Sequence, residues 1–179
     1  MKKHDYYTVC LNEQLGTFGL SVKEIDEFNK NINTLSKLYQ TGFFDIPEDK
    51  GVYIVFRPEN FEINFSGNTT AITEYRGKSM LYDSIDLHTK YEKSDKIILY
   101  IGKASGEKNK LKSRIKQLVL YGCKKYNNHR GGRAIWQIEN NKDLIIGYCR
   151  CNNPKEKEKE LLKKYQEIYE VFPVANWKY

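Results

Sequence analysis

The sequence predicts an α+β fold in which a small mixed or antiparallel sheet of three strands is flanked by helices. Three β-branched and aromatic runs predict the strands, at residues 51–56, 97–101 and 144–148. Apolar residues at three- and four-residue steps predict helices before, between and after these runs. With 179 residues, of which 40% are hydrophobic, the chain is long enough to bury a core.

The first fifty residues carry a helical pattern. Apolar side chains repeat with helical spacing at Val22, Ile25, Phe28, Ile32, Leu35 and Tyr39. Ser21 suits the N-cap and Glu24 completes a capping box, while Gly42 suits the end of the helix. We therefore predict an N-terminal helical extension over residues 1–50, ahead of a domain that spans residues 51–179.

The remaining elements follow in order. Residues 57–96 separate the first two strands, and they contain a Gly, Asn and Thr-rich stretch and a helix predicted over 78–91. A further helix is predicted over 111–122, and residues 130–138 are ambiguous between helix and strand. The last helix is predicted over 154–171, because a proline suits its first turn.

Positive charge gathers in residues 96–135. This window holds eleven Lys and Arg against a single acid, Glu107, whereas the whole chain has a net charge of +7. Tyr100, Tyr121 and Tyr126 lie among these cations. Cations interleaved with aromatic residues favour contact with phosphates and bases. We therefore predict a nucleic-acid partner, although charge alone also fits a solvated basic face.

Several protein classes do not fit the sequence. The apolar runs are far shorter than the roughly 20 residues of a membrane span, and residues 1–7 show no secretory signal. We therefore expect a cytoplasmic protein without a membrane partner. The cysteines lack the spacing of a zinc site and are expected to be reduced thiols. They are Cys10, Cys123, Cys149 and Cys151.

One acid of the final helix points inward. At about 100° per residue, this helix has an apolar face made by Leu161, Leu162, Tyr165, Ile168, Tyr169 and Phe172. Of five acids on the helix, only Glu158 falls near the middle of that face. A carboxylate that faces inward must be paired, protonated or bound to metal, because an isolated buried charge is very costly. A partly buried salt bridge is the structural alternative.

Further side chains on the predicted helix and strands are candidates for chemistry. Arg114 and Tyr121 lie on one flank of the predicted 111–122 helix, where the planar guanidinium group of Arg114 suits a phosphate. Tyr53 and Tyr100 lie in different predicted strands and are expected to share one face of the sheet. Packing alone also explains arginines and tyrosines at such positions.

These residues resemble the GIY-YIG nuclease family. Gly51-Val52-Tyr53 followed by Tyr100-Ile101-Gly102 resembles its paired signature, with Val in place of the first Ile. Later landmarks of the family occur in its order: Lys103, Arg114, Glu158 in Glu-x-x-Leu-Leu at 158–162, and Asn176 in Pro-x-x-Asn at 173–176. Residues 129–137 also resemble a segment of restriction-type and stand-alone members. The resemblance covers residues 51–179, and the family's shorter hairpin marks residues 57–96 as an insertion.

The resemblance implies a metal-dependent endonuclease, of restriction type as one expectation, that hydrolyses phosphodiester bonds in double-stranded DNA. The implied cofactor is Mg²⁺, or another divalent cation such as Mn²⁺, with Glu158 as its ligand. Arg114 would stabilise the negative charge of the transition state.

The family also implies roles for the other landmark residues. Tyr53 is the candidate general base, with a pKa lowered by nearby cations, and His129 is a rival for that role. Tyr100 and Lys103 would orient water or phosphate, and Asn176 would fix its neighbours by hydrogen bonds.

The basic residues around this site are expected to bind DNA. They are Lys112, Lys116, Lys124, Lys125, Arg130 and Arg133. A homodimer is a further expectation. One alternative is a non-catalytic nucleic-acid-binding module that keeps the GIY-YIG fold. Another is an interaction protein whose basic window meets an acidic protein surface.

Overall fold

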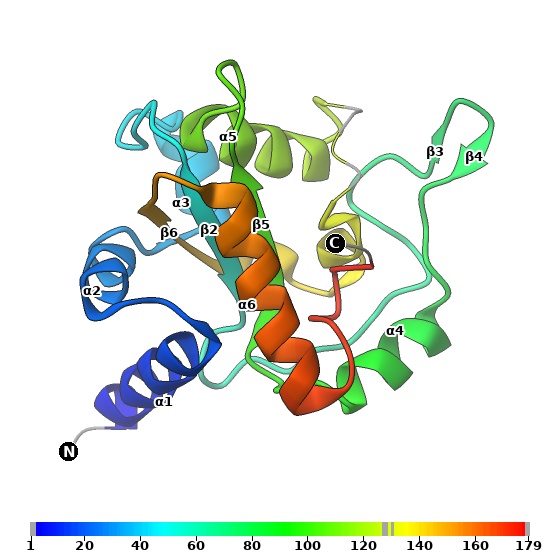
Figure 1. The fold of residues 1–179 in the computed structure, drawn as a ribbon. Coiled ribbons are helices and arrows are strands. Elements are labelled where there is room, and N and C mark those ends of the chain that lie inside the picture. The colour runs from blue at the N-terminus through cyan, green and yellow to red at the C-terminus, as the bar shows by residue number, and fades with distance from the viewer. Residues whose placement is uncertain (1–2, 127–128, 130, 178–179) are drawn as a thin grey trace.

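The computed structural model describes residues 3–126, 129 and 131–177, without the side chains of residues 3–7 and 9. An antiparallel sheet lies at its centre, in the order β1 (Asn33–Thr34), β6 (Ile145–Arg150), β2 (Gly51–Phe56) and β5 (Ile98–Ala104) (Figure 1). The helices are α1 (Lys3–Phe18), α2 (Val22–Lys30), α3 (Leu35–Thr41), α4 (Ser84–Glu92), α5 (Leu111–Gly122) and α6 (Pro154–Tyr169). The 3₁₀ helices η1 (Arg133–Gln137) and η2 (Asn141–Asp143) and a hairpin of β3 (Glu74–Tyr75) with β4 (Lys78–Ser79) complete the fold. The predicted α+β class is confirmed.

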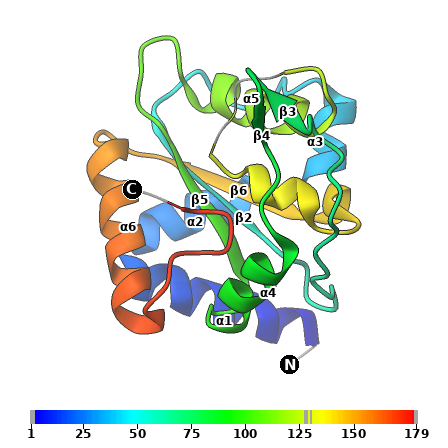
Figure 2. The ribbon, with the colours of Figure 1, turned by 90° about the vertical axis from the view of Figure 1, so that its right-hand side faces the viewer.

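Strand β2 lies in the middle of the sheet and all six of its residues are buried. Helices α1, α2 and α6 cover one face, and α3, α5 and η1 cover the other. Figure 2 shows α6 on one side of the sheet and η1 on the other. Alternate residues of β2 therefore pack into two different hydrophobic cores, one on each face of the sheet.

The N-terminal extension packs directly on the sheet. Leu15 of α1 and Phe28 of α2 are fully buried beside Leu161 and Leu162 of α6. The ring of Phe28 occupies the space that a side chain at Gly147 would need. The extension therefore contributes to the same core as β2.

The predicted long helix of the extension is wrong in its middle. Its start is confirmed, because Ser21 and Glu24 form the capping box, and its end falls at Gly42 as predicted. Between them the chain forms two helices, because the Thr34 hydroxyl accepts the Lys37 N–H and starts α3 anew. The intervening β1 pairs with β6 and adds a fourth strand to the predicted three.

The predicted helix over 78–91 begins later than expected. Lys78–Ser79 forms β4, and α4 starts at Ser84 because the Asp83 carboxylate accepts the N–H groups of Ile85 and Asp86. The ambiguous segment at 130–138 contains η1, a 3₁₀ helix. The predicted strands and the helices at 111–122 and 154–171 are present, with ends shifted by a few residues.

Residues 57–96, which the resemblance marks as an insertion, pack on the rest of the protein through a column of side chains. The Tyr82 and Trp177 rings stack with centroids 4.4 Å apart. The Arg133 guanidinium lies 4.2 Å from the Tyr82 centroid, and the Lys90 ammonium lies 4.3 Å from that of Trp177. In addition, the Gln137 amide bonds both backbone groups of Tyr82 at 2.8 Å. The insertion is therefore anchored to both η1 and the C-terminal segment.

Asp95 should make stability fall as pH rises. Its carboxylate accepts the N–H groups of Ile97 and Ile98 and the hydroxyl of Tyr165, yet burial raises its pKa from 3.8 to about 6. The folded state thus holds the proton more tightly, so this stabilisation is present below about pH 4 and is lost through pH 6.

We expect the Asp95→Asn variant, which cannot ionise, to escape this loss. Between pH 4 and pH 7, its free energy of unfolding should improve relative to the wild type by about 2 kcal/mol. Urea unfolding of both proteins at the two pH values measures the difference. If the free energies of unfolding of the two proteins change equally with pH, Asp95 is ionised in the folded protein throughout this range.

Candidate active site

The two signature tyrosines share one face of the sheet, as predicted. Tyr53 of β2 lies opposite Gly102 of β5, and the Tyr53 ring centroid lies 5.9 Å from that of Tyr100. Both side chains are buried. Gly102 makes this arrangement possible, because a Cβ atom there would lie 2.5 Å from Cζ of Tyr53. The glycine of the second signature half therefore provides the space for the tyrosine of the first.

Gly131 and Gly132 allow the chain to pass close to Tyr100, and His129 lies beside the same ring. A Cβ atom at Gly131 would lie 2.6 Å from the Tyr100 hydroxyl, and Gly132 has a φ of +69° that favours glycine. With this close approach, the His129 ring meets Tyr100 edge-on at a centroid distance of 6.5 Å. His129 is fully buried. Its burial follows from the loop's path and is not visible in the sequence pattern.

Glu158 enters from α6 on the other side of β5. It is buried, as the helical pattern predicts, whereas the other four acids of this region are exposed: Glu156, Glu160, Glu167 and Glu170. The Glu158 carboxylate forms an ion pair with Lys103, the residue that follows Gly102. Burial raises the pKa of Glu158 above 4.5, against the opposing effects of Lys103 and Arg114.

Arg114 on α5 is the shared electrostatic neighbour of these groups. Its positive charge acts on the pKa of Tyr53, His129 and Glu158. The guanidinium donates to Gln117 Oε1 at 2.7 Å. Gln117 in turn donates to the Ser113 hydroxyl at 3.2 Å. Sequence reasoning missed Gln117, although its spacing of three residues from Arg114 on a helix could have indicated the contact.

The buried polar groups of this site are poorly hydrogen-bonded. The Tyr53 hydroxyl and both ring nitrogens of His129 are buried and make no well-formed hydrogen bond to any described residue, although Tyr100 and Arg114 lie close enough to affect the pKa of Tyr53, and the Gly131 backbone that of His129. Buried polar atoms usually have a partner, so such a gathering calls for an explanation. A ligand that supplies donors and acceptors would provide one.

Burial also sets the protonation of these groups. It raises the pKa of the Tyr53 hydroxyl above 10, and Arg114 only partly opposes this effect. Burial and the charge of Arg114 lower the pKa of His129 to about 3. At neutral pH, Tyr53 therefore carries its proton and His129 is neutral, which differs from the lowered pKa expected for Tyr53.

Asn176 holds strand β5 through its side-chain amide. Its amide oxygen accepts the Ile101 N–H at 2.9 Å, and its amide nitrogen donates to the Ile101 carbonyl at 2.8 Å. The Ala175 N–H donates to the Leu99 carbonyl at 2.9 Å. These bonds fix the strand that carries Tyr100 and Gly102.

The predicted DNA-binding cations have different surroundings. Lys116 and Lys124 are exposed, and Lys112 lies 3.8 Å from Glu48. Lys125 donates to the Tyr39 hydroxyl at 2.6 Å, and Arg133 takes part in the column that anchors the insertion. Arg130 lies outside the described residues.

A metal at this site would have Glu158 as its carboxylate ligand. The described residues contain no cluster of three or more His, Cys, Asp or Glu side chains that would hold an ion. Mg²⁺ is often held by one or two carboxylates, with water and substrate phosphates completing its shell. A single buried carboxylate beside Arg114 fits that mode of binding.

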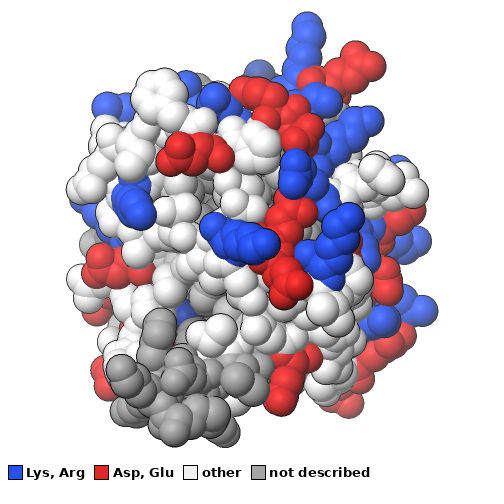
Figure 3. Space-filling model, turned by 90° about the vertical axis from the view of Figure 1, so that its left-hand side faces the viewer, with Lys and Arg blue, Asp and Glu red and all other residues white. Residues whose placement is uncertain are grey.

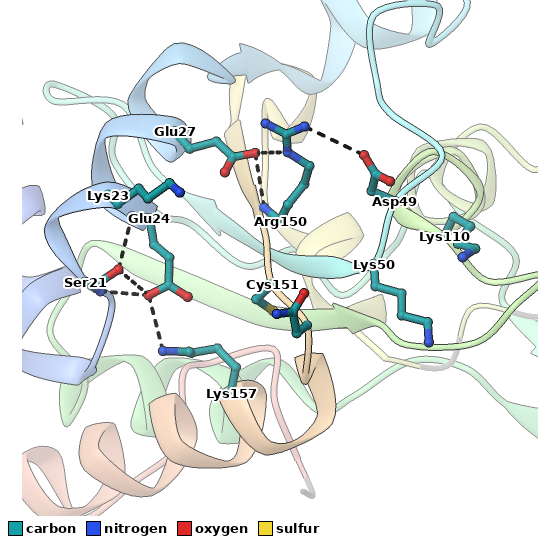
Figure 4. Close-up of a pocket in the computed structure, with 11 residues that line it drawn as sticks. Ser21, Lys23, Glu24, Glu27, Asp49, Lys50, Lys110, Arg150, Cys151 and Lys157 are labelled. Atoms are coloured by element: carbon teal, nitrogen blue, oxygen red, sulfur yellow. Dashed lines mark hydrogen bonds and ion pairs between the residues drawn. The ribbon is translucent and has the colours of Figure 1, made fainter.

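A cavity of about 930 Å³ lies elsewhere, between α2, the end of β6 and the start of α6 (Figure 4). Its carboxylates are already paired, with Glu27 2.6 Å from Arg150 and Glu24 3.2 Å from Lys157. Figure 3 shows cations and carboxylates side by side on the left-hand face of Figure 1. None of the predicted catalytic residues lines this cavity, so it is distinct from the candidate site.

Comparisons of the chain with models of protein families, with curated proteins and with solved structures gave no match. Among the described residues, no helix is long and apolar enough to cross a membrane.

Replacing Gly102 tests the position of Tyr53. We expect Gly102→Ala to destabilise the protein by about 1–3 kcal/mol, because the new methyl group overlaps the Tyr53 ring. Gly67→Ala is the control, since a Cβ atom there meets nothing within 4 Å. Urea unfolding gives both values.

A double-mutant cycle makes this test specific. In a Tyr53→Ala background the overlap disappears, so Gly102→Ala should lose most of its cost there. An equal cost in both backgrounds would mean that the glycine does not make space for this ring.

Proposed function

We propose that the chain is a divalent-metal-dependent endonuclease, with a GIY-YIG-like catalytic centre, that hydrolyses phosphodiester bonds in DNA. The observation that carries this proposal is the gathering of the unsatisfied Tyr53 and His129 groups around Arg114, beside the Lys103–Glu158 ion pair. These residues come from five separate parts of the chain. Hydrophobic packing alone gives no reason to bury such groups together without well-formed hydrogen bonds.

Each of these residues is suited to one part of the reaction. Arg114 and Lys103 offer positive charge to the scissile phosphate, and Arg114 stabilises the added charge of the transition state. The protonated Tyr53 hydroxyl donates a hydrogen bond to a phosphate oxygen. Glu158 holds the cation, which when bound neutralises charge on the phosphate and the leaving oxygen.

The proton released by the attacking water needs an acceptor. His129 is neutral at physiological pH and its ring nitrogens make no well-formed hydrogen bond to a described residue, so it accepts this proton directly or through the tyrosine hydroxyls. The bond between phosphorus and the leaving oxygen then breaks, and the leaving oxygen takes a proton from solvent. The low pKa of His129 is compatible with this role, because a bound phosphate would raise it.

Replacing Glu158 tests the catalytic centre. We expect Glu158→Gln to reduce Mg²⁺-dependent cleavage of supercoiled plasmid by about a thousandfold or more, because it removes the charge that holds the cation. DNA affinity should stay within about threefold, since the Lys and Arg contacts remain. Gel electrophoresis and a filter-binding assay measure the two effects.

The matched control is Glu156→Gln, an exposed acid two residues earlier on the same helix. It should cleave at the wild-type rate. Cleavage by Glu158→Gln at that rate would contradict the metal-ligand assignment. DNA binding without cleavage by the wild type, with any divalent cation, would instead favour the non-catalytic module.

Removing the Tyr53 hydroxyl should separate stability from activity. This oxygen is buried without a well-formed hydrogen bond, so Tyr53→Phe should leave the free energy of unfolding unchanged or raise it by about 1 kcal/mol. The same variant should lose roughly a hundredfold or more in cleavage rate.

Thermal unfolding and plasmid cleavage by the same preparation make this comparison. A variant that is destabilised but fully active would show that the hydroxyl serves the fold and not the reaction.

A further inference from the structure

A second pocket joins the three parts of the chain. It has a volume of about 540 Å³ and lies between α3 of the extension, the end of α5, η1 and Thr70 of the insertion. Helices α3 and α5 pack beside each other, as Figure 1 shows. None of the predicted catalytic residues lines this α3–α5 pocket. Its size lies within the range of sites for small organic ligands.

The walls of the α3–α5 pocket suit a flat aromatic ligand. Tyr39 and Trp136 contribute aromatic surface, and Leu35 and Val119 contribute aliphatic surface. The Lys125 ammonium donates to the Tyr39 hydroxyl at 2.6 Å, which holds this ring in place. Nucleobases stack on such rings whatever their sequence.

Trp136, which lines the α3–α5 pocket, contains a hydrogen-bond donor without a partner. This residue is only 2% exposed, and its indole nitrogen is buried and has no hydrogen-bond partner among the described residues. Buried donors without partners are rare in folded proteins. The Gln40 amide, also in the lining, can bond the edge of a base.

Cations at the same pocket suit a phosphate. Lys124 and Lys142 both line it and are exposed to solvent. Lys124 has a φ of 58°, in the left-handed region where glycine is favoured at the end of a helix. The chain therefore places a lysine where glycine would be more stable.

We propose that the α3–α5 pocket binds a single unstacked nucleotide of DNA, with its base against Tyr39 and Trp136 and its phosphates held by Lys124 and Lys142. This inference rests on the proposed function, because it takes DNA as the substrate. It gives the extension and the insertion a shared role, since each supplies part of the wall of a site that the catalytic domain alone would leave incomplete.

Cys123 provides a direct probe of occupancy, because it lines the pocket as a free, partly exposed thiol. We would measure its alkylation by iodoacetamide, with peptide mass spectrometry to separate it from the other cysteines. The probes are dAMP, dGMP, dCMP and TMP at millimolar concentrations. At ten times the dissociation constant, a bound nucleotide should slow alkylation roughly tenfold.

Two controls identify the source of the protection. Deoxyribose 5-phosphate lacks the base and should leave alkylation unchanged. A single-stranded oligonucleotide, used with the Glu158→Gln variant to prevent cleavage, should protect Cys123. Protection by free nucleotides but not by the oligonucleotide would overturn the assignment to DNA, and no protection by any probe would overturn the pocket itself.

A filling substitution tests the location. Thr70→Trp places a large side chain in the pocket, and calorimetry should show nucleotide affinity at least about tenfold weaker. Asn68→Trp is the matched control, because Asn68 is equally exposed in the same loop but does not line this pocket. Equal affinity of the two variants would contradict the proposal.

Lys124→Gly gives a second, independent readout. Relief of the left-handed backbone should raise the thermal midpoint, while loss of the cation should weaken nucleotide binding. A variant that is more stable and binds equally well would argue against a role for Lys124. None of these measurements depends on cleavage. A protein that binds nucleotides here but does not cleave DNA would therefore refute the proposed nuclease function and leave the proposed nucleotide site standing.

Discussion

The position of β2 between two strands and two helical layers is the constraint on which the rest of the structure depends. Because all six residues of this strand are buried, every side chain must find its partners inside the protein. Val52, Ile54 and Phe56 do so among the apolar side chains of α1, α2 and α6. Tyr53 points the opposite way, and only the missing side chain of Gly102 gives its ring room. The candidate site follows from that one accommodation, since Tyr100 lies against the same ring, Arg114 acts on its hydroxyl, and His129 lies against Tyr100.

Most side chains of the candidate site lie on strands and helices, and burying their polar groups has an electrostatic cost. Tyr53, Tyr100 and Lys103 lie on strands, and Arg114 and Glu158 lie on helices that pack against them. Such supports hold side chains more accurately than loops do. The cost is a set of buried polar groups without well-formed hydrogen bonds, which the apolar cores on both sides of the sheet must offset. The opposing pKa changes of Tyr53 and His129 come from the same burial, since a low-dielectric interior disfavours the charged form of either group.

The sequence predicted those parts of the fold and site that depend on local periodicity. The inward direction of Glu158 follows from the helical repeat, and the shared face of the two tyrosines follows from the alternation of strands. The break at residues 31–34 could not be found in this way, because the apolar repeat continues across it and pairing with β6 decides the outcome. Burial of His129 is likewise a long-range effect, set by the passage of Gly131 and Gly132 over Tyr100. The stacking of Tyr82 on Trp177 joins residues far apart in the chain, and no local sequence pattern indicates such a contact.

The hydrogen bonds that the Asn176 side chain and the Ala175 backbone make to β5 also bear on how the molecule behaves in a crowded solution. Strand β5 lies at one border of the sheet, where unpaired backbone groups would invite another chain to add itself as a further strand. Segment 175–176 occupies those groups at Leu99 and Ile101. The opposite border is β1, which is only two residues long in the part of the chain that the structure describes. A sheet whose two borders are thus covered or cut short offers little template for aggregation, even though its strands are rich in the β-branched residues that favour it.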